Sequence, residues 1–287
     1  MPPETGPFAV TTAGCLTVSA RLLYNKIKIL AGLYPEREEN CMKERARIAA
    51  GATAEVFQWD ETRILKLFLA GYPEQAVRRE YENARITADY AFAKPAVYGI
   101  VEQDGRSGIL YEYVRGENLL ERMLRTGEPD LIRQMAELHR KVLACPGDGL
   151  TDYRDRLSGA IRDASWLSED ARQDALAACR ALPEGNALCH GDLHPGNILL
   201  SNGQPVLIDF QDLCRGPALY DIARTVFLME CTPIPTGMPE QEAAAQAQLR
   251  RACTEGYLAF MGVRREELTP YFGPIVASRS DVPHENA

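Results

Sequence analysis

The sequence predicts an α+β protein of two lobes, with a small antiparallel sheet in the N-terminal lobe and mostly helices in the C-terminal lobe. Two observations support this prediction. Short apolar segments separated by turn residues dominate residues 45–113, whereas helical periodicity dominates after Gly116. The composition, 46% hydrophobic and 25% charged over 287 residues, is ordinary for a globular protein of this size. We expect an extension at 1–41, the N-terminal lobe at 42–114 and the C-terminal lobe at 115–287.

The N-terminal lobe is predicted to contain five strands and one helix. Residues 45–59 alternate between apolar and small residues, which indicates a hairpin whose turn is Gly51-Ala52-Thr53-Ala54. The helix is expected at 74–88, directly after Pro73, because apolar residues there recur at helical spacing. The remaining strands are predicted at Ile64–Phe68, 96–101 and 108–113, the last two joined by an Asp104-Gly105 turn.

The C-terminal lobe is predicted to be helical except around two polar motifs. Helical periodicity marks Leu119–Leu124, Asp130–Leu143, Tyr153–Ile161, Ser168–Ala181 and Pro239–Met261. Short apolar strands are expected at Ala187–Cys189, Ile198–Leu200 and Val206–Ile208, with Asn202-Gly203 as the turn between the last two. The polar motifs therefore lie on turns between short strands.

The overall charge and the cysteines exclude several classes of protein. A net charge of −8 argues against a general nucleic-acid-binding protein, which would carry a basic face, and mildly favours a cationic substrate. The eight cysteines form no Cys-x-x-Cys pair, so neither a zinc ribbon nor a disulfide framework is predicted, and a cytoplasmic location is expected. No apolar run approaches the roughly 20 residues of a membrane-spanning helix, so no membrane association is expected.

The most informative motif is His190-Gly191-Asp192-Leu193-His194-Pro195-Gly196-Asn197, followed by Ile208-Asp209-Phe210-Gln211-Asp212. Phosphoryl transfer needs a carboxylate that orients the attacking hydroxyl and oxygen ligands that hold Mg²⁺ against the phosphates. We expect Asp192 to be the base and Asn197 and Asp209 to bind the metal. The structural alternative is an Asx turn at Asp192 and a helix cap at Asp209.

Lys66 is a single cation among four large apolar residues of the third strand. A buried ammonium needs a partner, so we expect Lys66 to pair with nucleotide phosphates and Glu80, at the margin of the apolar helix face, to pair with Lys66. The alternative is an edge-strand lysine whose amine reaches water. Phosphate contact is also expected from the turn that contains Gly51 and Thr53, through backbone N–H groups and the Thr53 hydroxyl.

Residues 110–116 lie where the lobes meet, which is a natural place for an adenine-sized crevice. Backbone groups of Glu112 and Val114 are the candidates for pairing with the nucleotide base. The alternative is a plain strand end followed by a linker.

The histidines and Asp221 are expected to support the motif. His190 and His194 resemble a metal-binding pair, but such a pair needs a helix, which Gly191 and Pro195 forbid. We therefore expect His190 to hydrogen-bond within the loop, and His194 either to position the loop or to line the active site. We expect Asp221 to accept hydrogen bonds from backbone N–H groups of the loop. His139 is interpreted as a packing residue.

These motifs resemble the aminoglycoside phosphotransferase and choline kinase family, the small-molecule branch of the protein-kinase-like fold, over about residues 44–280. The resemblance implies ATP or GTP, Mg²⁺, and transfer of the γ-phosphate to a hydroxyl of a small molecule. It also implies that Asp192 is the base, that Asn197 and Asp209 bind metal, and that Lys66 and Glu80 form the phosphate-orienting pair.

The sequence departs from protein kinases after the second motif. Asp209-Phe210-Gln211 replaces Asp-Phe-Gly, and only eleven residues separate Asp209 from Asp221. So short a gap leaves no room for a peptide-binding activation segment, which disfavours a protein kinase.

Two other classes of function compete with a small-molecule kinase. One is a catalytically quiet nucleotide-binding or sensor protein on the same scaffold, and the other is a metal-dependent hydrolase that uses His190 and His194. The presence of Asp192, Asn197, Asp209 and Lys66 together favours the kinase. The acceptor pocket is expected from residues 150–182 and 239–275, which contain no motif that identifies the acceptor.

Overall fold

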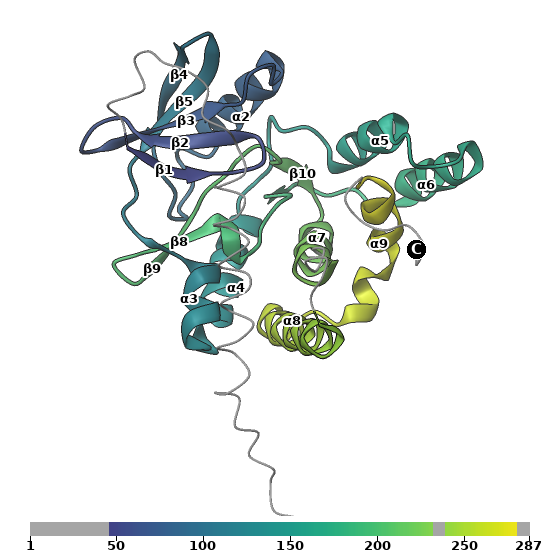
Figure 1. The fold of residues 1–287 in the computed structure, drawn as a ribbon. Coiled ribbons are helices and arrows are strands. Elements are labelled where there is room, and N and C mark those ends of the chain that lie inside the picture. The colour runs from purple at the N-terminus through teal and green to yellow at the C-terminus, as the bar shows by residue number, and fades with distance from the viewer. Residues whose placement is uncertain (1–45, 232–238, 280–287) are drawn as a thin grey trace, which may run out of the picture.

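A computed structural model describes residues 46–231 and 239–279, so the extension expected at 1–41 lies outside the described residues. The antiparallel sheet occupies one end of the molecule and the helices fill the other, which confirms the predicted fold class (Figure 1). The elements of the sheet region are β1 (Arg47–Ala50), β2 (Ala54–Gln58), β3 (Arg63–Phe68), α2 (Glu74–Ile86), β4 (Val97–Gln103) and β5 (Arg106–Glu112).

The sheet has the order β1-β2-β3-β5-β4, with every neighbouring pair antiparallel, and α2 packs against β4 and β5. Successive side chains of a strand point to opposite faces, so Lys66 lies on the face opposite Leu65 and Leu67. Leu65 and Leu67 belong to a small separate apolar cluster, whereas Ile109, the cross-strand partner of Lys66, packs in the main core. Strand alternation therefore aims Lys66 at the side of the sheet that α2 covers.

The remaining elements begin directly after the sheet. In chain order they are β6 (Glu117–Asn118), α3 (Leu119–Thr126), α4 (Asp130–Leu143), α5 (Tyr153–Asp163), α6 (Glu169–Ala181), β7 (Ala187–Cys189), η1 (Pro195–Asn197), β8 (Ile198–Ser201), β9 (Gln204–Leu207), β10 (Cys214–Gly216), α7 (Ala218–Cys231), α8 (Glu240–Met261), η2 (Arg265–Leu268) and α9 (Thr269–Ala277). Strands β6, β8 and β9 form one small sheet, and β7 pairs with β10. Helix α7 lies centrally against α8, α9 and β7 (Figure 1).

The helices predicted from periodicity all occur, and three of them begin at a capping side chain. Asn118 caps α3, Asp152 caps α5 and Ser168 caps α6, each accepting a hydrogen bond from a backbone N–H of the first turn. The Asn202-Gly203 turn joins β8 to β9 as expected, with both residues at positive φ. Within the described residues, no helix is both long and apolar enough to cross a membrane.

Two helices were not predicted, each for a physical reason. In α7, every residue from Tyr220 to Leu228 is buried, so the helix has no polar face and its sequence shows no helical period. Helix α9 contains Pro270 and Pro274 around Gly273, residues that normally argue against a helix. Pro270 lies in the first turn, where a missing N–H has no effect on helical hydrogen bonding.

The burial of β5 gives a direct test of the fold. Ile109 is fully buried, whereas Ile100, its cross-strand partner on β4, is 38% exposed. We expect Ile109→Ala to lower the free energy of unfolding by about 2–5 kcal/mol, because it leaves a cavity, and Ile100→Ala to lower it by much less. Denaturant unfolding of both variants measures the difference, and equal losses would contradict the described packing.

Candidate active site

The loop between β7 and β8 carries the motif residues 190–197 and lies directly against the segment that follows Asp209. Gly191 has φ +76°, and a Cβ there would come within 2.3 Å of the carbonyl oxygen of Asp212. Only glycine allows this approach. The two motifs, separated in sequence, are therefore brought together by backbone packing.

Asp221, near the start of α7, fixes the beginning of this loop. Its Oδ2 accepts a hydrogen bond from the His190 N–H at 2.6 Å and its Oδ1 accepts one from the Gly191 N–H at 2.8 Å. The His139 ring lies 3.0 Å from Oδ2 through Nε2 and 2.6 Å from the Tyr257 hydroxyl through Nδ1. Asp221, His139 and Tyr257 are fully buried. The loop is thus held by a carboxylate that is itself held by α4 and α8.

The carboxyl group of Asp221 stays ionised because of these partners. Burial acts to raise its pKa, but the hydrogen bond from His139, the electrostatic effect of the nearby histidine rings and the bond from Gly191 outweigh burial. The pKa of Asp221 is therefore lower than that of an ordinary aspartate.

Asp192 and Asn197 form a pair across the loop. The Asn197 side-chain nitrogen donates to the Asp192 carbonyl oxygen at 2.9 Å and to its Oδ2 at 3.0 Å. Because the nitrogen must face these two acceptors, the amide oxygen of Asn197 faces away from Asp192 and is available as a hard oxygen ligand. The donor type suits Mg²⁺, which prefers oxygen ligands.

Lys66 lies between two carboxylates. Its Nζ is 2.8 and 3.0 Å from the two carboxylate oxygens of Glu80 and 3.0 Å from Oδ1 of Asp209. Burial acts to lower the pKa of Lys66, but Asp209 and Glu80 outweigh burial and hold it above that of an ordinary lysine. Desolvation acts in turn to raise the pKa of Asp209, and Lys66 outweighs it and lowers that pKa. The expected pairing of Lys66 with Glu80 is confirmed.

Asp209 adopts a backbone conformation that is uncommon for a residue with a side chain. Its φ is +68°, in the left-handed region, which aspartate enters more readily than most residues but still at a cost. Asn83 of α2 donates to the carbonyl oxygens of Phe210 and Gln211 at 2.9 and 3.3 Å, and so holds the following turn. This geometry directs the Asp209 carboxylate towards Lys66, and 37% of that side chain remains exposed. The described residues contain no group of three His, Cys, Asp or Glu side chains that could hold a metal by itself.

The two other predicted nucleotide contacts have a simple backbone geometry. The Gly51 N–H donates to the Ala54 carbonyl at 2.8 Å, which closes the hairpin, and the Thr53 carbonyl accepts from the Leu69 N–H at 3.0 Å. A Cβ at Gly51 would meet only the Ala54 carbonyl oxygen, at 3.6 Å, so this turn does not itself require glycine. At the lobe junction, the Val114 N–H donates to the Glu112 carbonyl at 3.1 Å, so these two groups satisfy each other.

The structure refines the roles expected for the histidines. His194 positions the loop as predicted, since its Nδ1 accepts from the Gly196 N–H at 3.0 Å. The expectation for His190 is only partly correct. Its backbone N–H bonds to Asp221, but its two ring nitrogens are buried without a hydrogen-bond partner among the described residues, and the ring packs edge-on against Phe210. The His190 side chain therefore packs, and only its backbone hydrogen-bonds.

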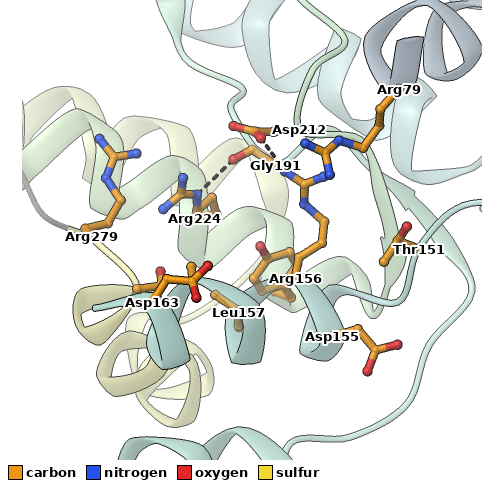
Figure 2. A pocket seen from close by; sticks show the side chains of 14 residues that line it. Arg79, Thr151, Asp155, Arg156, Leu157, Asp163, Gly191, Asp212, Arg224 and Arg279 are labelled. Carbon is orange, nitrogen blue, oxygen red and sulfur yellow. Dashed lines mark hydrogen bonds and ion pairs between the residues drawn. The ribbon is translucent and has the colours of Figure 1, made fainter. Parts of the chain in front are cut away.

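Sequence reasoning missed four residues that build this site. Asn83 lies three positions after Glu80 on the same helix face, a spacing that could have revealed it. The Tyr111 hydroxyl donates to Glu80 Oε1 at 3.0 Å. Arg224 donates through Nε to the Gly191 carbonyl at 2.8 Å, and Arg156 forms an ion pair with Asp212 (Figure 2). No local signal marks these arginines, because their partners are distant in sequence.

Comparison with known proteins places this geometry in a family. The model of the phosphotransferase enzyme family matches residues 44–262. A solved aminoglycoside-3'-phosphotransferase of type VIII is similar at 22% identity and a TM-score of 0.58, covering 89% of this chain and 98% of that one. APH(3'')-Id of Streptomyces rimosus, solved with ADP and streptomycin, is similar at 18% identity and a TM-score of 0.57, covering 90% and 98%. Among curated protein sequences, no relative matches the chain.

The buried carboxylate of Asp221 leads to a prediction with a pH dependence. Asp221→Asn leaves one acceptor oxygen where the loop needs two, so we expect the free energy of unfolding to fall by about 2–3 kcal/mol at pH 7. Because the pKa of Asp221 is lower in the folded than in the unfolded protein, its charge stabilises the fold at pH values above the unfolded pKa, about 3.9 for aspartate. This stabilisation is lost as the pH falls through the pKa of the folded state. The deficit of the variant should therefore shrink below about pH 4.

Urea unfolding at pH 7 and at several acidic pH values measures this deficit. Asp174→Asn, on the exposed face of α6, is the matched control and should change little at any pH. An Asp221→Asn deficit that stays constant from pH 7 into the acid range would contradict the role given to the carboxylate charge.

Proposed function

The chain belongs to the phosphotransferase enzyme family, and we propose that it transfers the γ-phosphate of ATP, or of GTP, to a hydroxyl of a small molecule. One observation carries the proposal. Lys66 is bound to both Glu80 and Asp209, beside the loop that carries the Asp192–Asn197 pair. A fold alone would not require two carboxylates to share one partly buried lysine, whereas phosphate orientation and metal binding do.

In this proposal Asp192 is the catalytic base. Asn197 fixes one of its carboxylate oxygens by a hydrogen bond at 3.0 Å, which orients the carboxylate. The acceptor hydroxyl donates its proton to Asp192 while its oxygen forms a bond to the γ-phosphorus. The bond between the γ-phosphorus and the bridging oxygen breaks, and the nucleoside diphosphate leaves with that electron pair.

Asn197 and Asp209 are proposed to hold Mg²⁺. The Asn197 amide oxygen faces away from Asp192, and Lys66 lowers the pKa of Asp209, so both present oxygen ligands at neutral pH. Bound Mg²⁺ would neutralise phosphate charge during transfer. Because the protein supplies few ligands, the site fits Mg²⁺ that keeps waters and phosphate oxygens in its coordination sphere.

Lys66 is proposed to bind the nucleotide phosphates while Glu80 holds it in place. Glu80 is well suited to that role, since its side chain is 1% exposed and receives a further hydrogen bond from Tyr111. Gly51 and Thr53 would cover the phosphates from the β1–β2 hairpin. A purine base would replace the Val114–Glu112 hydrogen bond at the lobe junction with its own pairing to the same two backbone groups.

The lobe boundaries and the compartment belong to the same proposal. We place the N-terminal lobe at 42–114 and the C-terminal lobe at 115–287, so that the nucleotide binds where they meet. A cytoplasmic location is supported by the six described cysteines, all of which are free thiols. Cys189 and Cys214 lie opposite each other on β7 and β10, fully buried, as small packing residues would.

The function is tested by the loss of the proposed base. We expect Asp192→Asn to reduce acceptor-dependent consumption of ATP or GTP by about 10²–10⁴-fold, because the amide cannot accept the hydroxyl proton, and to retain nucleotide binding. Turnover with Mg²⁺ is measured against a panel of hydroxylated small molecules, with Asp174→Asn as control. Nucleotide binding by the wild type without transfer to any acceptor would instead favour a quiet sensor.

A further inference from the structure

A pocket of about 420 Å³ opens beside the loop that carries Asp192, and it is large enough for a small metabolite. It lies between α2, α5, the start of α7 and the end of α9, and Gly191, the residue before Asp192, forms part of its wall (Figure 2). Residues 151–163 contribute as expected for an acceptor site, whereas none of residues 239–275 does. A ligand in this pocket therefore lies beside the proposed base.

The charge of this pocket is opposite to that of the whole protein. Four arginines from four parts of the fold line it, against three aspartates, although the chain carries a net charge of −8. One of the aspartates, Asp212, is already paired with Arg156. The other two, Asp155 and Asp163, are exposed residues of α5. The arginines are Arg79, Arg156, Arg224 and Arg279.

Arg224 has more hydrogen-bond donors than the protein satisfies. Its side chain is only 8% exposed, and its Nε donates to the Gly191 carbonyl at 2.8 Å. Its Nη1 is buried and finds no acceptor among the described residues. Burying a guanidinium with unpaired donors costs folding free energy, and an anionic ligand from outside the chain would pair with the free donor of Arg224.

Arg79 is a second guanidinium without a protein partner. It lies on α2 next to Glu80, and among the described residues it makes no hydrogen bond or ion pair, whereas its neighbour Arg78 is paired with Glu74. In Figure 2 the side chain of Arg79 points toward Arg156 at the mouth of the pocket. Because Asp212 already compensates the charge of Arg156, Arg79 is an exposed guanidinium whose donors remain available to an anion.

We propose that this pocket binds an anionic group of the acceptor, either a carboxylate or a phosphate. The acceptor is then a hydroxylated acid rather than a cation. A guanidinium group binds a carboxylate or a phosphate with two parallel hydrogen bonds, and the positive charges of the arginines repel a polyamine. An anion held by Arg79 and Arg224 would leave the acceptor hydroxyl beside the loop that carries Asp192. The inference rests on the proposed kinase function and replaces the weak expectation of a cationic substrate from net charge.

Inorganic phosphate is the first probe. The protein is titrated with phosphate at constant ionic strength, with ADP and Mg²⁺ saturating the nucleotide site, and the midpoint of thermal unfolding is followed. We expect phosphate to raise the unfolding midpoint of wild type and of Arg78→Gln equally. Arg79→Gln should need about tenfold more phosphate for the same rise, because it has lost one charge-assisted hydrogen bond. Arg78→Gln is the matched control, because it removes a neighbouring surface arginine of the same helix.

Equal stabilisation of Arg79→Gln and wild type, or no stabilisation beyond that given by sodium chloride, would overturn the inference. A titration with ADP alone keeps this outcome separate from failure of the proposed function. If ADP binds and phosphate has no effect, only the anionic acceptor is wrong, whereas absence of ADP binding would remove the kinase proposal as well.

The second probe is a set of acceptors that share two hydroxyls and differ in charge: glycerate, 1,2-propanediol and 3-amino-1,2-propanediol. Preferential phosphorylation of glycerate, with a higher KM in Arg79→Gln and an unchanged KM for nucleotide, would support the inference. Preferential phosphorylation of the amine would contradict it while leaving the kinase function established.

Discussion

The charge of Lys66 is shared between Glu80 on α2 and Asp209 on the segment after β9, and this contact joins three separate parts of the chain. Burying the Lys66 ammonium and the Glu80 carboxylate costs several kcal/mol per ion, so their pairing is stable only when their hydrogen-bonding groups are also satisfied. The Tyr111 hydroxyl donates to Glu80, and the Asn83 amide holds the backbone directly after Asp209 through the Phe210 carbonyl. The sheet, the helix that covers it and the turn at Asp209 therefore take up positions that keep these charges paired.

A second buried carboxylate, Asp221, fixes the loop of residues 190–197. Asp221 accepts hydrogen bonds from two consecutive N–H groups of the loop and is approached by His139, which also contacts Tyr257. Arg224, one helical turn after Asp221, holds the Gly191 carbonyl. The N–H and C=O groups at the start of the loop are thus bound to one helix, α7, so the helix that sequence periodicity failed to reveal is the one that positions the proposed base.

The sequence predicted those parts of the site that a short stretch of residues identifies by itself. Lys66 stood out as a cation within an apolar strand, and the confirmed partner Glu80 followed from helix geometry. The parts that sequence did not reveal depend on distant packing. Helix α7 is buried all round, so its residues show no period, and the ring of His190 packs on Phe210 instead of hydrogen-bonding. The arginine-lined pocket draws on residues 79 to 279, and no spacing rule connects positions so far apart.

The central claim is that Asp209 and Lys66 form a nucleotide–metal site, and calorimetric titration of the protein with ADP, with and without Mg²⁺, tests it most directly. The wild type should bind ADP more tightly when Mg²⁺ is present, because Asp209 would help to hold the ion and the ion would neutralise phosphate charge. Asp209→Asn should lose most of that gain and keep residual binding, since Lys66 and the lobe junction remain. Equal Mg²⁺ dependence in wild type and Asp209→Asn, or no ADP binding by the wild type, would contradict the account.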